Sequence, residues 1–374
     1  MKSKLVICFN IICCSTFLFG CWDQTLLKDV TLIKAQAFDV GTDKNLIKTT
    51  ISIIETDSNV KIPSGNVILS AEGASTRDTR TNLDEEVSSE LFATKNQITL
   101  ISSDLAKQGL YALLDANFRS PLSALSAKLV ITDGKAGTIL HTKPENTPLI
   151  SDYLSDLIDS EEQMGVVPVV DLQRALTILY DDGKDLILPR LTILDGLVGA
   201  QIAGTALFNN NHMSGTLNTD QTSLLLLLGD NKKSAHRLTR KVHSFSSSSL
   251  YDYITADVMK AERSLKVARN DNNMFEVQIE LTLKLNVIEY PANHLYKKQV
   301  IASLNEKLSK QLTEEANQIL EILKESKCDY LGIGRQVQAR YNSSWKSMNW
   351  KEVYPAIQMQ ANVKTEIETH GIIN

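Results

Sequence analysis

Residues 275–290 read FEVQIELTLKLNVIEY, and apolar and polar residues alternate along the whole stretch. Six apolar side chains share one side of it: Val277, Ile279, Leu281, Leu283, Leu285 and Val287. Because successive side chains of a strand point to opposite faces of a sheet, this period of two predicts a β-strand with one buried face. The preceding run, residues 258–268, predicts a partner strand. The segment NDNN at 270–273 predicts the turn between them, since Asn and Asp tolerate left-handed geometry.

A long helix is predicted after Pro291, with Asn293 as its N-cap and Lys327 as its end. Its apolar stripe consists of Val300, Leu304, Leu308, Leu312, Ala316, Ile319, Leu320 and Leu323. Roughly 34 residues at ~1.5 Å each would span ~50 Å, enough to cross a whole domain. We interpret the stripe as a core-packing face, with a partner-binding helix as the alternative. Gly332 and Gly334 are expected to stop the helix, and a last strand is expected at residues 356–368.

The N-terminal part of the chain alternates strand and helix signals. The expected strands are residues 30–40, 46–55, 67–71, 97–102 and 127–132. The expected helices are residues 75–92, 104–115, 135–141, 152–159 and 171–180. The first two strands are separated by GTDKN at 41–45, which predicts a hairpin. The alternation predicts an α/β or α+β unit that ends near Gly196.

The strands become longer from Gly199 onward, where residues 200–209 and 212–217 predict another hairpin. At roughly 150 residues per domain, a chain of 374 residues is expected to form two or three domains. We therefore expect a signal segment at 1–20, an N-terminal α/β domain at 21–198 and a C-terminal domain at 199–374. The predicted fold class is α+β, with several subdomains, mixed sheets, packed helices and one long C-terminal helix.

The composition is that of a folded globular protein. Hydrophobic residues make up 43% of the chain and charged residues 22%, which excludes a disordered or collagen-like protein. Lys and Arg number 39 against 44 Asp and Glu, which gives a net charge of −5. Because an acidic chain has no electrostatic attraction to phosphates, no nucleic-acid partner is expected.

Four of the five cysteines lie within the first 21 residues. Lys2 and Lys4 precede the apolar run 5–20, which has the length and flanks of a secretory signal rather than of a spanning helix. The run ends in LFGC at 18–21, which resembles the bacterial lipobox, so we expect cleavage before Cys21 and diacylglyceryl attachment to its thiol. An uncleaved anchor or an ordinary signal peptide is the alternative. Lipidation would leave Cys328 as the only free thiol, so no intramolecular disulfide is expected.

No sequence pattern indicates catalysis or metal binding. The six histidines are scattered, and none has the spacing of a zinc site such as HExxH. Three pairs of adjacent acids would suit a glycosidase by composition only, at 161–162, 181–182 and 314–315. Nothing marks a base for Cys328, which we expect to pack at the end of the long helix. We expect no enzyme activity, no cofactor and no metal.

One basic cluster interrupts the acidic chain, formed by Lys232, Lys233, Arg237, Arg240 and Lys241. Such a cluster can contact anionic lipid headgroups, at about 1 kcal/mol per charge, or an acidic partner surface. The alternative is a solvated strand face. Charge alone does not separate the two.

Several short motifs, taken in order, resemble the Ger(x)C family, the lipoprotein C subunits of spore germination receptors. The chain carries CWD at 21–23, then GTALF at 204–208 and MSGTL at 213–217. The closest likeness is C-terminal, where CDYLGIG at 328–334 follows the long helix and precedes Trp345, Trp350 and Tyr354-Pro355. The resemblance covers nearly the whole chain after the signal segment.

This resemblance implies a non-enzymatic subunit, anchored by lipid to the outer face of the spore's inner membrane, that acts in nutrient-triggered germination with two multi-pass membrane partners. It also implies three subdomains built around β-sheets, for which we place a further division near residue 268. It supplies no catalytic residues and leaves open whether this subunit contacts the germinant. The alternative from another functional class is a lipid-anchored solute-binding protein or cell-wall enzyme.

Overall fold

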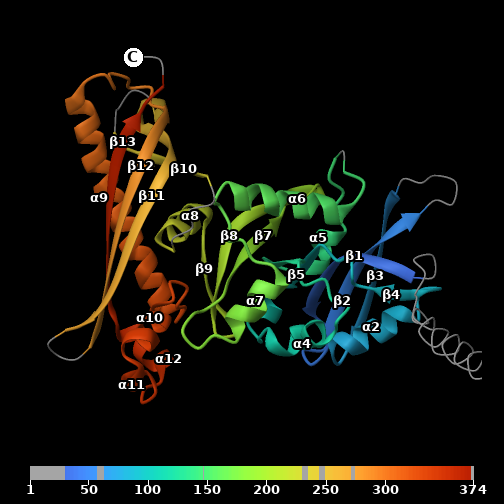
Figure 1. Ribbon diagram of the computed structural model, residues 1–374. Coiled ribbons are helices and arrows are strands. Elements are labelled where there is room, and N and C mark those ends of the chain that lie inside the picture. The colour runs from blue at the N-terminus through green and yellow to red at the C-terminus, as the bar shows by residue number, and fades with distance from the viewer. Residues whose placement is uncertain are drawn as a thin grey trace, which may run out of the picture.

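The computed structural model describes residues 30–56, 63–145, 147–229, 235–243, 249–270 and 274–371. Within them the chain forms two separate β-sheets, joined through helix α8 (Figure 1). Cys21, Lys232 and Lys233, to which the sequence assigns possible roles, lie outside the described residues.

The first sheet is mixed and has the strand order β3-β2-β1-β5-β6-β7-β8-β9, with the short β4 paired to β1. Its strands are β1 Val30–Val40, β2 Ile47–Thr56, β3 Pro63–Gly73, β4 Glu90–Phe92, β5 Ile98–Ser102, β6 Lys128–Thr132, β7 Ile187–Ile193, β8 Ala200–Asn209 and β9 His212–Leu217. The central strands β1, β5, β6 and β7 are parallel, and antiparallel hairpins extend the sheet on both sides. All five residues of β5 are buried, as expected for a strand covered on both faces.

Helices cover both faces of the first sheet. They are α2 Thr76–Asp84, α3 Ser103–Ala106, α4 Tyr111–Arg119, α5 Ala136–Leu140, α6 Ile150–Gln163 and α7 Leu172–Leu179. One core packs α3, α4 and α7 against the sheet, and a second core packs α5 and α6 against the opposite face. Strand β5 serves both cores, because Ile101 points into the first and Leu100 into the second. The result is a three-layer arrangement, visible in Figure 1 with α5 and α6 above the sheet and α4 and α7 below it.

The second sheet has the order β10-β11-β12-β13, with strands β10 His236–Lys241, β11 Tyr253–Arg269, β12 Phe275–Glu289 and β13 Gln358–Thr369. Strands β10 to β12 are antiparallel, and β13 is parallel to β12. Helix α9, Lys298–Glu325, packs along one face. The remaining helices are α8 Thr219–Leu228, α10 Ile333–Arg340, α11 Asn342–Trp345 and α12 Trp350–Val353, with 3₁₀ turns at η2 Asp195–Leu197, η3 Ser249–Asp252 and η4 Tyr354–Ala356.

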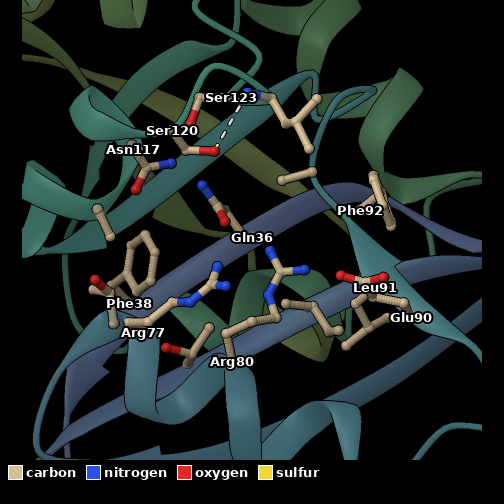
Figure 2. Close-up of a pocket in the computed structure, with 16 residues that line it drawn as sticks. Gln36, Phe38, Arg77, Arg80, Glu90, Leu91, Phe92, Asn117, Ser120 and Ser123 are labelled. Atoms are coloured by element: carbon tan, nitrogen blue, oxygen red, sulfur yellow. Dashed lines mark hydrogen bonds between the residues drawn. The ribbon is translucent and has the colours of Figure 1, made fainter. Parts of the chain in front are cut away.

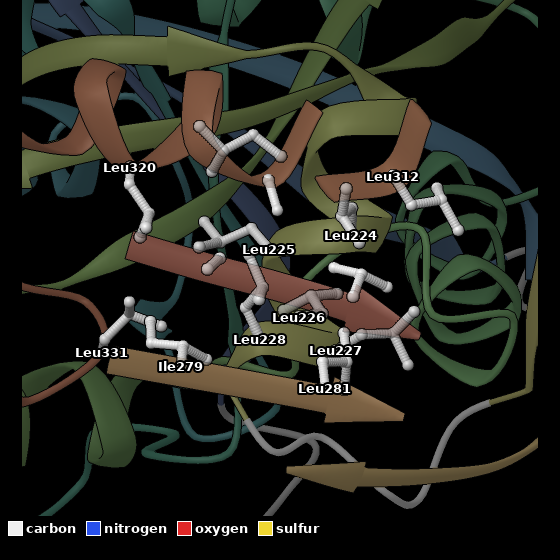
Figure 3. Close-up of a cluster of buried hydrophobic side chains, with 14 of the residues drawn as sticks. Leu224, Leu225, Leu226, Leu227, Leu228, Ile279, Leu281, Leu312, Leu320 and Leu331 are labelled. Atoms are coloured by element: carbon white, nitrogen blue, oxygen red, sulfur yellow. The ribbon is translucent and has the colours of Figure 1, made fainter. Parts of the chain in front are cut away.

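From Thr222 to Leu228, helix α8 is buried between the two sheets. It follows β9 after a capping box, in which Asn218 and Gln221 each bond the other's backbone N–H. Leu224 to Leu228 are each at most 1% exposed, and Figure 3 shows them among Leu312 and Leu320 of α9 and Ile279 and Leu281 of β12. Because a fully buried leucine contributes roughly 1.5–3 kcal/mol, this helix ties the first sheet to the core of the second.

Helix α9 also pairs with the edge strand β13 through its polar side chains. Asn305, Ser309, Thr313 and Asn317 follow one another at intervals of four residues. They accept hydrogen bonds, in the same order, from the backbone N–H groups of Ile367, Thr365, Val363 and Ala361, at 2.9–3.0 Å. Four residues of helix rise about 6 Å and two residues of strand about 6.6 Å, so the two rows stay in register. The helix thereby satisfies an edge that would otherwise offer unpaired groups to another chain.

Most expected elements are confirmed. The hairpins β1–β2, β8–β9 and β11–β12 form as predicted, and the half-buried pattern of β12 is observed. The long C-terminal helix exists, and its stripe from Leu304 to Leu323 is buried in the core. The predicted fold class, α+β with mixed sheets, packed helices and one long C-terminal helix, is therefore correct.

Four local predictions were wrong. The helix expected at 75–92 ends at Asp84, and residues 90–92 form strand β4. The helix expected at 104–115 is divided into α3 and α4 around Gly109, whose φ is +116°. The long helix begins at Lys298, with Lys297 rather than Asn293 at its N-cap. Gly332 does not stop it but opens α10, with a φ of 70°.

The expected domain boundary at 198/199 falls between two paired strands. Strands β7 and β8 are antiparallel neighbours, so the first sheet continues through β9 to Leu217. The further division expected near residue 268 lies at the end of β11, which pairs with β12 from Thr255 to Arg269. By sheet membership, the chain passes from one unit to the other at α8.

Candidate functional site

The described part of the basic cluster lies on strand β10, and each of its charges has an acidic partner. Arg237 and Lys241 are exposed, and they pair with Asp257 at 2.8 Å and Asp252 at 3.2 Å. Arg240 points inward, is only 6% exposed, and pairs with Glu315 of α9 at 2.9 Å. Arg240 therefore holds β10 to α9. A membrane or partner contact through Arg237 and Lys241, with Lys232 and Lys233, stays a prediction.

A second group of polar residues joins the two sheets, and we call it the sheet junction: Asp185, Cys328, Asp329, Trp350 and Lys351. Asp185 precedes β7 of the first sheet, and Asp329 lies in the turn between α9 and α10. The backbone N–H of Asp185 donates to the carbonyl of Asp329 at 2.9 Å. In turn, the N–H of Asp329 donates a hydrogen bond to the Asp185 carboxylate at 2.8 Å. The two acids are 2% and 1% exposed, so these bonds are shielded from water.

Every donor around the Asp329 carboxylate comes from the C-terminal helices. Its oxygens accept from the backbone N–H groups of Ile333 at 2.8 Å and Gly334 at 2.7 Å. They also accept from the Trp350 indole at 3.1 Å. Burial raises the pKa of Asp329 to about 6, against its usual value of 3.8, although these hydrogen bonds oppose the shift. Asp329 thus orients α10 and α12 around one buried carboxyl group.

Within the rest of the junction, Cys328 is buried and Lys351 is partly exposed. Lys351 pairs with the Asp185 carboxylate, which also accepts from the N–H of Asn210 at 2.9 Å. Cys328 is fully buried, and burial raises the pKa of its thiol well above the usual value. A thiol held protonated is a poor nucleophile, so Cys328 has the packing role that the sequence suggested.

Two glycines allow the backbones of the two units to touch at this junction. A Cβ on Gly334 would lie 2.7 Å from the Trp350 indole nitrogen and 2.8 Å from Cα of Gly183. The N–H of Arg335 donates to the carbonyl of Gly183 at 3.1 Å, and the Arg335 side chain pairs with Asp181. The close approach explains why this chain carries glycine at both 183 and 334.

A cavity of about 190 Å³ lies on one face of the first sheet, between α2 and α4 (Figure 2). Its walls combine polar and apolar side chains from β1, β2, α2, β4, α4 and the segment after α4. The polar ones are Gln36, Thr49, Thr76, Arg77, Arg80, Glu90, Asn117, Ser120 and Ser123. Figure 2 shows Arg77 and Arg80 projecting from α2 into the same space, below Gln36 and Asn117.

Arg80 is the most unusual group in this cavity. Burial lowers the pKa of its guanidinium, while the nearby carboxylates of Asp84 and Glu90 act in the opposite direction. In the part of the chain that the structure describes, the guanidinium of Arg80 has no hydrogen-bond or ion-pair partner. Sequence reasoning missed this residue, because nothing in the helix expected at 75–92 indicated a cavity beside it. The sequence feature that could have indicated Arg80 is its spacing from Arg77: residues three apart lie on one face of a helix.

Two kinds of feature are absent from the described residues. No group of three or more His, Cys, Asp or Glu side chains among them is placed to hold a metal ion. Within the same ranges, no helix has both the length and the apolar character needed to cross a membrane.

Two protein-family models match the chain in succession. The model described as the spore germination protein N-terminal domain matches residues 23–193. The model described as the spore germination B3/GerAC-like C-terminal domain matches residues 203–371. The first match ends with β7 and the second begins within β8, close to the boundary expected from sequence.

Whole-length relatives and a solved structure agree with these matches. Spore germination protein GerQC of Bacillus cereus is 23% identical over 359 residues, which cover 96% of this chain and 97% of the relative. Spore germination protein KC of Bacillus subtilis is 23% identical over 379 residues, covering 95% and 93%. The crystal structure of the GerBC protein superposes with a TM-score of 0.58 at 15% identity, covering 89% of this chain and 97% of that one. This structural likeness shows a shared fold.

Proposed function

Because the chain belongs to the GerAC family of spore germination proteins, and so has a role in germination, we propose that it is a lipid-anchored, non-enzymatic subunit of a germinant receptor. The observation that carries the proposal is the match of both family domains, in order, over nearly the whole chain. In this proposal, two multi-pass membrane proteins complete the receptor at the outer face of the spore's inner membrane.

The proposed anchor is a diacylglyceryl group on Cys21. Two acyl chains, at about 0.8 kcal/mol for each buried CH₂, are enough for stable membrane attachment where one chain is not. Val30, the first residue of β1, follows Cys21 by nine residues. Since an extended chain spans at most about 3.3–3.6 Å per residue, β1 would start within about 30 Å of the lipid. The anchor therefore fixes the first sheet close to the membrane surface.

Replacing the acylated cysteine tests the anchor. We expect Cys21→Ala to release the protein from spore membranes and to impair the response to nutrient. Cys14→Ala, which alters a cysteine of the same signal segment but keeps Cys21, is the matched control and should change neither property. If Cys21→Ala spores retain the protein in the membrane and germinate like the control, lipid anchoring at Cys21 is wrong.

Co-purification tests the proposed partners. The chain is tagged after Asn374 and solubilised from spore membranes. We expect two multi-pass membrane proteins to accompany it in fixed proportion, and to do so less well when Cys21→Ala has removed the anchor. Recovery of the tagged chain alone under conditions that preserve other membrane complexes would contradict a receptor subunit.

One observation favours a second candidate function, a lipid-anchored solute-binding protein, namely the polar cavity between α2 and α4. A cell-wall enzyme has less support. In each acid pair that the sequence offered for glycoside chemistry, one carboxylate is engaged by a basic side chain: Glu162 by Lys128, Asp181 by Arg335 and Glu315 by Arg240. Turnover of wall fragments by the purified protein would favour the enzyme over the receptor subunit.

A further inference from the structure

We propose that the cavity between α2 and α4 is a binding site for a small organic monocarboxylate, with Arg77 and Arg80 as the groups that hold its carboxylate. No other feature of the described chain combines enclosed space with a free pair of cationic donors. Binding at this cavity requires neither the lipid anchor nor the membrane partners. Its test is therefore independent of the proposed receptor role.

The two guanidinium groups are positioned by a well-fixed helix. Ser75 caps α2 by accepting from the N–H of Asp78 at 3.1 Å. On the buried side of the helix, the Thr79 hydroxyl bonds that of Thr49 on β2 at 2.7 Å, and Leu83 is fully buried. Because Thr79 and Leu83 set the rotation of the helix, Arg77 and Arg80 both face the cavity, as Figure 2 shows.

Arg80 lacks the bonds that a half-buried guanidinium normally makes. A guanidinium carries five N–H donors in a planar fork that matches the two oxygens of a carboxylate. Removing such a group from water without supplying acceptors is unfavourable. Burial already lowers the pKa of Arg80, which agrees with this cost. A bound carboxylate would supply the hydrogen-bond acceptors that Arg80 lacks.

The charges in the cavity select a ligand with a single negative charge. Its wall contains two cationic groups, Arg77 and Arg80, and one carboxylate, Glu90. The lining thus has one net positive charge, which a monocarboxylate neutralises. A dianion or a phosphate would bring excess negative charge close to Glu90, and like charges in a partly buried site repel each other.

The remaining walls favour an organic ligand over a bare inorganic ion. Phe92, Ala93, Ala116 and Leu122 also line the cavity and keep part of their apolar surface accessible. These side chains offer an apolar surface for the hydrocarbon part of a ligand, as in most small-molecule sites. Asn117, Ser120 and Ser123 provide neutral hydrogen-bonding groups on the opposite side. A volume of about 190 Å³ limits the ligand to a small molecule.

Calorimetric titration of the full-length chain in detergent tests the proposal. The probes are butanoate and benzoate, their uncharged counterparts butanamide and benzamide, and inorganic phosphate. We expect at least one carboxylate to bind detectably and its amide about ten- to a hundredfold more weakly, the range given by a charge-assisted hydrogen bond. Equal binding of acid and amide, tighter binding of phosphate, or no binding of either carboxylate would overturn the proposal.

Variants locate the binding. Arg80→Gln should weaken carboxylate binding about tenfold or more. Arg80→Lys should recover only part of it, because an ammonium lacks the planar fork. Glu90→Gln should raise the affinity for phosphate relative to carboxylate. The matched control is Arg119→Gln, which removes an exposed arginine of α4 paired with Asp115 and should bind like wild type. Unchanged melting temperatures without ligand would establish folding, and wild-type affinity in Arg80→Gln would place the binding elsewhere.

Discussion

Asn317 of α9 makes two hydrogen bonds with a single residue of β13, Ala361. Its amide oxygen accepts from the N–H of Ala361 at 2.9 Å, and its amide nitrogen donates to the carbonyl of Ala361 at 2.9 Å. This is the pairing that a neighbouring strand would provide. A side chain of the helix therefore takes the place of a fifth strand at the edge of the second sheet.

Removing this amide should destabilise the protein. In Asn317→Ala the N–H and C=O of Ala361 lose both partners, and we expect the free energy of unfolding to fall by about 1–3 kcal/mol. Urea denaturation measures the change. Gln318→Ala, one residue along on the exposed side of α9, should stay within about 0.5 kcal/mol of wild type. Equal effects of the two substitutions would show that the edge pairing contributes nothing.

Lys351 compensates a buried charge at the sheet junction, so removing it should be costly. Lys351→Met keeps the length of the side chain but leaves the Asp185 carboxylate without its cation. Breaking a buried pair costs about 3–5 kcal/mol, and we expect a loss of that order in urea denaturation.

Two further variants separate the charge from packing. In Asp185→Asn/Lys351→Met the buried charge is gone, so the double variant should lose less than the sum of the two single changes. Lys346→Met removes an exposed lysine nearby and should have little effect. Strict additivity of the single changes would argue against the pair.

The stability of the protein should depend on pH through Asp329. The pKa of this carboxyl in the folded chain is about 6, above its usual 3.8, so between these values the folded state binds more protons than the unfolded state. The contribution of Asp329 to stability therefore decreases as the pH rises from about 4 to about 6, by about 2–3 kcal/mol at 1.36 kcal/mol per pKa unit.

A comparison of wild type with Asp329→Asn isolates this effect, because all other titrating groups are shared. We expect wild type to lose about 2–3 kcal/mol more than the variant between about pH 4 and about pH 7. Parallel stability curves for the two proteins would mean that Asp329 has the same pKa in the folded and unfolded states.

The close approach at Gly334 predicts that Gly334→Ala destabilises the protein, although Gly→Ala usually stabilises a helix. In an open helix, Gly→Ala stabilises by up to about 1 kcal/mol through helix propensity. At Gly334 the new Cβ would meet Trp350 and Gly183 at under 3 Å, so we expect a loss of about 1–3 kcal/mol. Gln336→Ala, on the exposed side of α10, should be close to neutral. A stabilised Gly334→Ala protein would show that the two backbones can separate freely.

Local sequence patterns predicted the strands and helices whose buried face shows directly in the spacing of their apolar residues. The alternation from Val277 to Val287 and the stripe from Leu304 to Leu323 reflect burial of one face, and both were recovered from the sequence. The polar row that includes Thr313 and Asn317 went unrecognised, since its partners in β13 lie 44 or more positions away. The sequence feature that could have revealed this row is a short polar residue at every fourth position, on a helix face that is otherwise charged.

The missed features of the junction and the cavity have the same cause. Asp185 and Asp329 are 144 residues apart, and nothing near either one indicates a buried carboxylate. Arg80 became notable only once β4 brought Glu90 beside it. The membership of β8 in the first sheet likewise follows from its pairing with β7, which no change in local composition announces.

The burial of α8 has a consequence for the order in which the protein can be completed during synthesis. Its five leucines leave the ribosome before α9, the helix that covers them, which ends at Glu325. About 97 residues separate the end of α8 from the end of α9, and at roughly 5–20 residues per second they take about 5–20 s to appear. Throughout that interval the five leucines lack the cover that α9 gives them in the folded protein. The five leucines are therefore buried as in the folded protein only after most of the chain, through Glu325, has been made.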